Sequence, residues 1–244
     1  MVMANDSTNV NEGKANKTSP CETVEEMIAR KPYSARNQVL AFNADYFALD
    51  NDHGPEGLTI KNGARLDGKY AVPPDYDAAA LRADGNTNET HRSSLSFSRT
   101  NTVRMGVQED CKTDCFYQPF DGDAYFNTVG GGPLFIEDGK KVCGFCGTLP
   151  CQNEGFATGP DGYCGSSAKA WTAVGVSQDG RYLIVVVGNK QTMDSITSIL
   201  LAEGAARAMK LDGGSSTQLW YKPQGVILGG GKPVANAIVV FSRP

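Results

Sequence analysis

Short apolar runs separated by turn-forming residues dominate the chain and predict a protein built mainly of β-strands. The segments expected to form strands are 38–47, 94–98, 102–106, 172–177, 182–188, 208–211, 218–221 and 237–241. A further hairpin is expected over Leu58–Leu66, because Asn62 and Gly63 at its centre both tolerate positive φ. Many strands and few helices imply a fold dominated by sheet.

Two segments have the pattern of helices. Thr23 followed by Glu26 is the capping-box pattern at the start of a short helix. The segment 193–204 has apolar residues at helical spacing, begins beside Thr192 or Asp194 as its cap, and ends in a glycine. The predicted fold class is therefore α+β: a single domain dominated by a mixed or antiparallel sheet, with a few helices.

The length of 244 residues suits one sizeable domain. Residues 1–20 are polar and lack periodicity, so we expect a mobile N-terminal tail before a domain spanning 21–244. A Cys-rich loop insertion is expected within that domain at about 143–167. No signal peptide is visible, and we interpret the chain as a secreted or cell-envelope protein whose leader has been removed.

The net charge and the hydropathy of the chain limit the classes of partner that it can bind. The chain has 23 Lys and Arg against 27 Asp and Glu, which gives a net charge of −4. This balance argues against a protein built for unselective binding to nucleic acid or to an anionic membrane surface. No apolar run approaches the roughly 20 residues that span a bilayer. The oligomeric state is left open.

The seven cysteines permit two interpretations. The positions are Cys21, Cys111, Cys115, Cys143, Cys146, Cys151 and Cys164. The last six form an even set that suits three disulfides in a secreted protein, which we favour. The alternative is a structural zinc site built from the last four, of which the first two have knuckle spacing. An odd total leaves at least one cysteine without a partner in the chain.

The most distinctive local motif is the loop Asp212-Gly-Gly-Ser-Ser-Thr217. Two adjacent glycines let backbone amides approach an anion, and the three hydroxyls add further donors. An acidic residue held beside such a loop can act as a base, a nucleophile or a stabiliser of charge. The alternative is a plain Gly-rich turn in which Asp212 makes an Asx-turn.

Two further segments are candidates for the site. Gly130-Gly-Gly-Pro133 is a rigid turn that suits a ligand lying on the main chain, although it also suits a turn alone. In Asn43-Ala-Asp-Tyr-Phe47, an extended chain would place Asn43, Asp45 and Phe47 on one face and Tyr46 on the other. That combination suits sugar binding, and a capped strand end would look similar.

Taken in order, these segments resemble the phosphodiester glycosidase family over about residues 23–243. The segments that carry the resemblance are Asn43–Phe47, Gly130–Phe135, Trp171–Gly175 and Leu211–Ser216, with weaker support from Gly57–Gly63, Arg92–Leu95 and Pro233–Asn236. The family has an arginine where this chain has Trp171, so Lys169, Arg92 or Arg181 is expected to supply its anion contact. Ala44 stands where the family motif has glycine.

The resemblance implies hydrolysis of a small-molecule or glycan sugar-1-phosphodiester at the anomeric C–O bond. It implies Asp212 and Asp45 as the catalytic carboxylates, without deciding which of them handles water. The substrate-binding residues that it implies are Asn43, Tyr46, Arg92, Gly130, Gly131, Gly132, Trp171, Gly213, Gly214, Ser215, Ser216 and Thr217. The two carboxylates could hold a divalent cation, but no ligand cluster requires one. The alternatives are a non-catalytic glycan-binding or envelope-polymer-binding module and a phosphodiesterase that cleaves the P–O bond.

Overall fold

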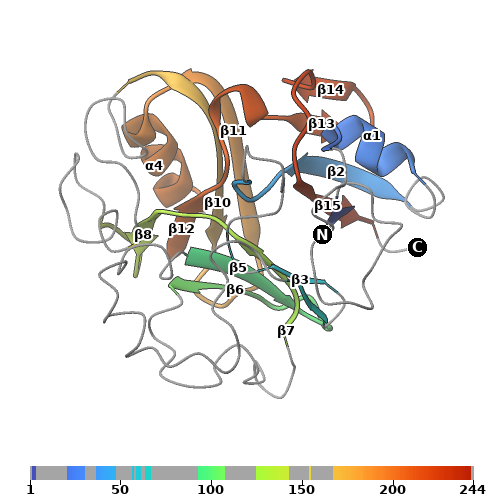
Figure 1. Ribbon diagram of the computed structural model, residues 1–244. Coiled ribbons are helices and arrows are strands. Elements are labelled where there is room, and N and C mark those ends of the chain that lie inside the picture. Colours follow the sequence, from blue (N-terminus) through green and yellow to red (C-terminus); the bar gives the residue numbers. More distant parts are fainter. Residues whose placement is uncertain are drawn as a thin grey trace, which may run out of the picture.

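The protein consists of three five-stranded sheets and two described helices, arranged around a shared interior (Figure 1). The computed structural model describes residues 2–3, 21–30, 37–47, 57, 59–61, 64–66, 93–107, 125–142, 154 and 167–242. Every pair of described strands is antiparallel, which confirms the expected α+β class and its antiparallel form.

The strands of each sheet come from distant parts of the chain. The first sheet has the order β1 (Val2–Met3), β15 (Asn236–Phe241), β2 (Gln38–Asn43), β13 (Leu219–Tyr221) and β14 (Gly225–Leu228). The second has the order β11 (Leu183–Gln191), β10 (Lys169–Val176), β12 (Arg207–Lys210), β8 (Leu134–Glu137) and β9 (Lys140–Lys141). The third has the order β4 (Ala64–Leu66), β3 (Thr59–Lys61), β7 (Tyr125–Gly130), β5 (Ser93–Ser98) and β6 (Val103–Val107).

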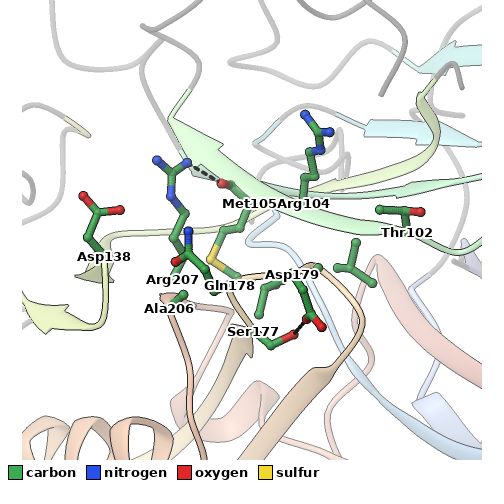
Figure 2. Close-up of a pocket in the computed structure, with 12 residues that line it drawn as sticks. Thr102, Arg104, Met105, Asp138, Ser177, Gln178, Asp179, Ala206 and Arg207 are labelled. Carbon is green, nitrogen blue, oxygen red and sulfur yellow. Dashed lines mark hydrogen bonds between the residues drawn. The ribbon is translucent and has the colours of Figure 1, made fainter. Parts of the chain in front are cut away.

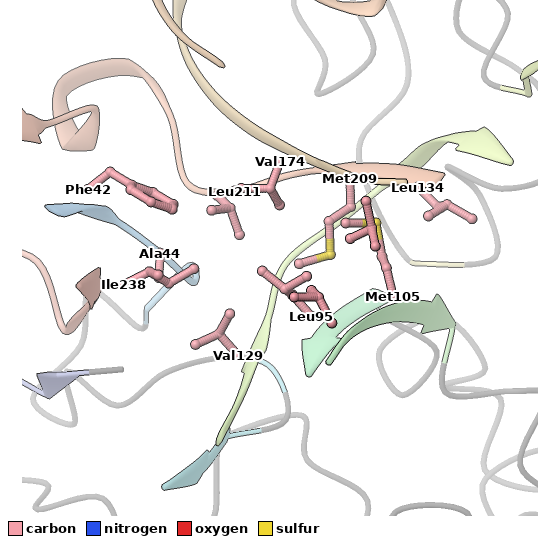
Figure 3. Packing of buried hydrophobic residues seen from close by; sticks show 12 residues of the cluster. Phe42, Ala44, Leu95, Met105, Val129, Leu134, Val174, Met209, Leu211 and Ile238 are labelled. Carbon is pink, nitrogen blue, oxygen red and sulfur yellow. The ribbon is translucent and has the colours of Figure 1, made fainter. Parts of the chain in front are cut away.

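One hydrophobic cluster joins all three sheets (Figure 3). Phe42 comes from the first sheet, Val174 and Met209 from the second, and Leu95 and Val129 from the third. All five side chains are at most 1% exposed. Because each sheet buries one face against the other two, the three sheets share this core within a single domain.

The two helices begin where the sequence predicts. Helix α1 (Val24–Ala29) has the full capping box: the Glu26 amide donates to Thr23 Oγ1 and the Thr23 amide donates to the Glu26 carboxylate. Helix α4 (Met193–Ala202) is capped by Thr192, so the alternative cap Asp194 lies in its first turn. In Figure 1, α1 lies beside β2 and α4 packs beside β10 and β11.

The predicted hairpins are present, but the strand expected to reach residue 47 is shorter. The partners Lys61 and Ala64 of the β3–β4 hairpin leave the two expected turn residues between them. Strand β2 instead ends at Asn43, because the next amides turn toward other segments: the Asp45 amide donates to Asn236 Oδ1. Residues 43–47 are all buried.

Several predictions fall on residues that the structure does not describe. Val2–Met3 pairs with β15, and the rest of the expected tail lies outside the described residues, as do Arg92 and most of 143–167. Cys21 is a free, half-buried thiol whose pKa burial raises, and the other six cysteines lie outside the described residues. No described helix is long and apolar enough to cross a membrane.

Replacing Gly131 by alanine is expected to destabilise the protein by about 1–3 kcal/mol. The new Cβ would lie 2.8 Å from the Lys210 carbonyl oxygen and 3.0 Å from side-chain atoms of Met209 and Leu211, so backbone must move. Gly231→Ala is the matched control, because a Cβ there meets nothing within 4 Å. Urea unfolding of both variants measures the difference, and equal stabilities would contradict the close packing at Gly131.

Candidate active site

Three chain segments that are far apart in the sequence meet at one place. The Asp212 amide donates to the Ala44 carbonyl at 2.9 Å, and Asn43 Nδ2 donates to the Asp212 carbonyl at 2.7 Å. The Tyr46 hydroxyl donates to the Gly132 carbonyl at 2.8 Å, which brings in the third segment. The structure therefore brings together the segments 43–47, 130–133 and 212–217, as the sequence predicts.

Asn43 holds this meeting point together. Its Oδ1 accepts from Thr172 Oγ1 at 2.7 Å and from the Gln218 amide at 3.0 Å, while its Nδ2 binds the Asp212 carbonyl. The side chain is 0% exposed. Asn43 was expected to bind substrate, but its described partners are protein groups, which supports a positioning role.

Asp212 is a partly exposed residue whose carboxyl has polar and charged neighbours. Its Oδ1 accepts from the Gly213 amide at 2.8 Å, and the Ser216 hydroxyl also donates to the carboxylate. Burial raises the pKa of Asp212 above its usual value, while Ser216, the Lys210 charge and the Gly213 amide act in the opposite direction. A carboxyl with these neighbours can take up and release a proton closer to neutral pH than an exposed one.

Lys210 is the site residue that the sequence analysis did not identify. It is 3% exposed, and its Nζ donates to the Tyr46 hydroxyl at 2.9 Å. Burial lowers the pKa of Lys210 from 10.5 to about 7, against the raising effect of Asp212 and with a smaller lowering effect from Lys169. The signal that could have found it is its interval of two from Asp212, which places both side chains on one side of an extended chain.

The Gly-rich loop offers fewer free donors than the sequence suggests. The Gly213 amide binds Asp212, and the amides of Ser216 and Thr217 close a 3₁₀ turn over Gly214–Ser216. The exposed amides of Gly214 and Ser215 find no acceptor among the described residues. Gly214 has a φ of 62°, and a Cβ there would meet nothing within 4 Å. These two amides are therefore open to a ligand.

Asp45 lies in a tight enclosure of backbone. Its Oδ2 accepts from the Gly57 amide at 2.8 Å, and the carboxyl is 1% exposed. A Cβ added at Gly130 would come within 2.7 Å of the same oxygen and 2.4 Å of the Gly57 Cα. The glycine at each position is required because no side chain fits between these segments and the carboxylate.

The glycine turn after β7 is also buried. The Gly131 amide donates to the Ser93 carbonyl at 2.9 Å and the Gly132 amide donates to the Lys210 carbonyl at 2.7 Å. The turn was expected to present its backbone to a ligand. Its amides instead hydrogen-bond to backbone carbonyls of the third sheet and of β12. The close approach that glycine allows is therefore made to other backbone.

Trp171 and Tyr46 enclose Lys210. The Lys210 Nζ lies 4.7 Å from the centre of the Trp171 ring and 5.0 Å from the centre of the Tyr46 ring. Both aromatic side chains are buried, and Trp171 Nε1 donates to the Gln191 carbonyl. Both were expected to bind substrate, but their ring faces lie near the Lys210 amine, which is a favourable cation–π arrangement when the lysine is charged.

Lys232 is a second cation beside the acidic loop. Its Nζ donates to Ser216 Oγ at 3.0 Å and lies 5.2 Å from the centre of the Phe47 ring.

Three cations were expected to replace the family arginine. Of these, Lys169 begins β10 near Trp171. Arg181 lies in the turn that connects β10 to β11. Trp171 pairs with Gly188, which is near the opposite end of this hairpin, so Arg181 lies away from Trp171.

Glu154 is another residue that the sequence analysis did not single out. Its carboxylate accepts from the Ser93 amide at 2.8 Å and from the Leu134 amide at 2.7 Å, and it is 1% exposed. One residue of the expected Cys-rich insertion therefore bridges β5 and β8. No periodic pattern surrounds Glu154, so the sequence offered no signal for this role.

A separate cavity of about 400 Å³ lies away from these residues (Figure 2). It is near the Val176 end of β10, and none of the predicted site residues lines it. Its polar side chains bind one another: Arg207 donates to the Met105 carbonyl at 2.8 Å, and the Ser177 hydroxyl donates to Asp179 at 2.6 Å. We therefore place the candidate site at Asp212 and Lys210.

No group of three or more His, Cys, Asp or Glu that could hold a metal ion occurs among the described residues. The possible divalent cation between Asp45 and Asp212 therefore stays a prediction, with no additional ligand of these types beside it in the described part of the chain.

Comparison with known proteins identifies the family. Residues 36–241 match the phosphodiester glycosidase family, which is most of the chain. This chain belongs to that family. No curated protein matches it.

Solved structures share the fold at low sequence identity. The catalytic domain of zebrafish N-acetylglucosamine-1-phosphodiester α-N-acetylglucosaminidase, auto-inhibited by its pro-peptide, is 14% identical, with a TM-score of 0.64 over 96% of this chain and 70% of that one. A hypothetical protein from Synechocystis is 16% identical, with a TM-score of 0.58 over 99% of this chain and 56% of its own. A putative exported protein from Burkholderia pseudomallei is 12% identical, with a TM-score of 0.56 over 93% and 69%.

The buried lysine predicts a pH dependence of stability. Between about pH 7 and 10.5 the unfolded chain keeps a proton on Lys210 that the folded protein has released, so this residue makes stability rise with pH. Lys210→Met is expected to remove this contribution, up to about 1.4 kcal/mol per pH unit. Urea unfolding of the protein and the variant from pH 7 to 9.5 measures it, with the exposed Lys140→Met as control. Parallel pH profiles of the protein and Lys210→Met would contradict it.

Proposed function

We propose that this protein hydrolyses a sugar-1-phosphodiester at the anomeric C–O bond and releases the free sugar and a phosphomonoester. The observation that supports this most is the partly exposed Asp212 carboxyl beside the open amides of Gly214 and Ser215. An acid group next to donors for an anion is what this reaction requires. Membership in the phosphodiester glycosidase family supports the same class of bond.

The reaction makes particular demands on the site. Water adds to the anomeric carbon as the C–O bond breaks, and the phosphomonoester leaves with the bonding electrons. A phosphomonoester is a good leaving group, so its protonation matters less than in ordinary glycosides. The positive charge that develops on the sugar ring needs a carboxylate nearby, and the attacking water needs a group that accepts its proton.

Asp212 suits the group that accepts a proton from water. It is partly exposed, so water can reach it, and burial raises its pKa, which makes it a stronger base than an ordinary carboxylate. The Gly213 amide and the Ser216 hydroxyl fix its orientation. These contacts preorganise the carboxylate before substrate arrives.

Asp45 suits the role of the carboxylate that stabilises the positive charge on the sugar ring. The backbone at Gly57 and Gly130 encloses its carboxyl, which leaves it little freedom to move. A fixed negative charge in a water-poor interior stabilises a developing positive charge more strongly than one in solvent. In this proposal Asp45 acts through its charge from within this enclosure, and Asp212 handles water.

The phosphate would bind at the open amides of Gly214 and Ser215. Ser216 and Thr217 are buried, and the Ser216 hydroxyl already contacts Asp212 and Lys232, so the Ser216 hydroxyl supports the loop. We assign Tyr46 and Trp171 to holding Lys210 in place of the substrate contact that the resemblance implied.

We also propose that the protein acts in an oxidising compartment outside the cytoplasm, with disulfides among the six cysteines other than Cys21. Alkylation without reduction is then expected to modify Cys21 alone, whereas alkylation after reduction modifies every cysteine. Intact-mass measurement of the purified protein distinguishes the two states. Additional thiols that become reactive on treatment with a chelator would instead indicate the zinc alternative.

Asp212→Asn is expected to lower turnover of a sugar-1-phosphodiester by about 10²–10⁴-fold while the protein stays folded. The amide keeps the shape of the side chain but cannot accept the proton of the attacking water. Asp138→Asn is the matched control, because Asp138 is exposed and asparagine tolerates its φ of 49°. Turnover of UDP-sugars and of polymeric sugar phosphodiesters is measured as sugar released, together with circular dichroism of each variant.

The position of bond cleavage is tested by hydrolysis in ¹⁸O-labelled water. Label in the sugar supports C–O cleavage, whereas label in the phosphate would contradict it and indicate a phosphodiesterase. Retention of the ligand without any release of sugar would indicate a binding module. Wild-type turnover by Asp212→Asn would overturn the role given to Asp212.

A further inference from the structure

The position of Lys210 suggests how this chain could contact an anion without the arginine that the family pattern has at position 171. Trp171 occupies the arginine position, and an indole cannot hold an anion by charge. The Lys210 ammonium lies 4.7 Å from the centre of the Trp171 ring. An amine that can carry a positive charge therefore lies over the side chain that replaces arginine, although it comes from β12 and not from β10.

The same ammonium lies against the Gly-rich loop. A Cβ built on Gly213 would be 3.5 Å from Lys210 Nζ, so the nitrogen borders the space on the side-chain side of this glycine. The open amides of Gly214 and Ser215 follow directly in the chain. A buried cation and two open amides thus gather around one short loop, and their shared preference is for a phosphate oxygen.

The structure around Lys210 holds the cation in this position. Tyr46 accepts a hydrogen bond from Nζ, and the rings of Tyr46 and Trp171 limit where the ammonium can move. The long side chain is fully ordered by these contacts before any ligand binds. A preordered cation loses less conformational entropy on binding than a flexible surface lysine.

We propose that Lys210 binds the phosphate charge of the substrate, in place of the arginine that the family pattern has at position 171. This inference rests on the proposed function for its choice of substrate, but phosphate binding can be measured without turnover. It makes Lys210 a specificity-determining residue that favours substrates with a phosphate at the anomeric oxygen.

Binding is then coupled to a proton. The charged groups that face Lys210 are Asp212 after β12 and Lys169 on β10, and the Tyr46 hydroxyl after β2 is its neutral titratable neighbour. Burial lowers the pKa of Lys210 to about 7, so above this pH the lysine is mostly neutral in the free protein. A bound phosphodiester brings a negative charge that raises this pKa, so the lysine takes up a proton as the anion binds.

The test uses diethyl phosphate, which keeps a single negative charge and does not itself titrate near neutral pH. Calorimetry at pH 8 in two buffers of different ionisation heat gives the number of protons taken up for each anion bound, and we expect about one. Carbon-13 NMR of the lysine Cε signals follows Lys210 directly. Its titration midpoint is expected near pH 7 in the free protein and higher with the anion present.

Two variants separate charge from packing. Lys210→Met is expected to bind diethyl phosphate about ten- to a hundredfold more weakly and without proton uptake. Lys210→Arg keeps a charge that does not titrate, so it is expected to bind the anion but take up no proton. Lys140→Met, an exposed lysine away from the site, is the matched control and should behave as the unmodified protein.

Unchanged affinity and proton uptake in Lys210→Met would overturn the proposal. A loss of affinity in Lys232→Met alone would also overturn it, by assigning the cation to Lys232. If Lys210→Met weakens anion binding but no sugar-1-phosphodiester is hydrolysed, the proposed function fails and the anion site stands. If the protein hydrolyses such substrates and Lys210→Met binds diethyl phosphate normally, the function stands and this inference fails.

Discussion

The buried amide of Asn43 is the interaction on which the site depends. Through one side chain it connects β2 to Thr172 in β10, to the start of β13 and to the carbonyl of Asp212. A buried amide without these partners would cost the free energy of several lost hydrogen bonds, so alternative arrangements of the segments are disfavoured. The acidic loop is held by this network before any ligand binds.

The site keeps two opposite charges in an interior that favours neither. Burial lowers the pKa of Lys210 and raises that of Asp212, so both groups approach neutral pH from opposite sides. Each side chain then partly supports the ionised state of the other. A pair of this kind responds to an additional charge, because the protonation of each group depends on the charge of its neighbour. This responsiveness is what a catalytic site for an anionic substrate uses.

Much of the fold could be predicted because local signals coincide with it. The capping box at Thr23 and the turn-bounded β10–β11 hairpin depend on residues close in sequence. Lys210 was harder to recognise, since a lysine at a strand end usually reaches solvent and only its interval of two from Asp212 indicates that the two side chains lie on one side of the chain. The glycines at 130–132 correctly indicated close approach, but glycine does not specify its neighbour, which here is other backbone and not a ligand.

Glu154 gives the Cys-rich insertion a structural dependence on the rest of the domain. Its carboxylate accepts amides of Ser93 and Leu134, which belong to different sheets. An engineered chain that joined residue 142 directly to residue 167 would lose this shared acceptor and leave two interior N–H groups without it. Within the insertion, the Glu154 side chain is therefore the group that connects this part of the chain to two sheets at once.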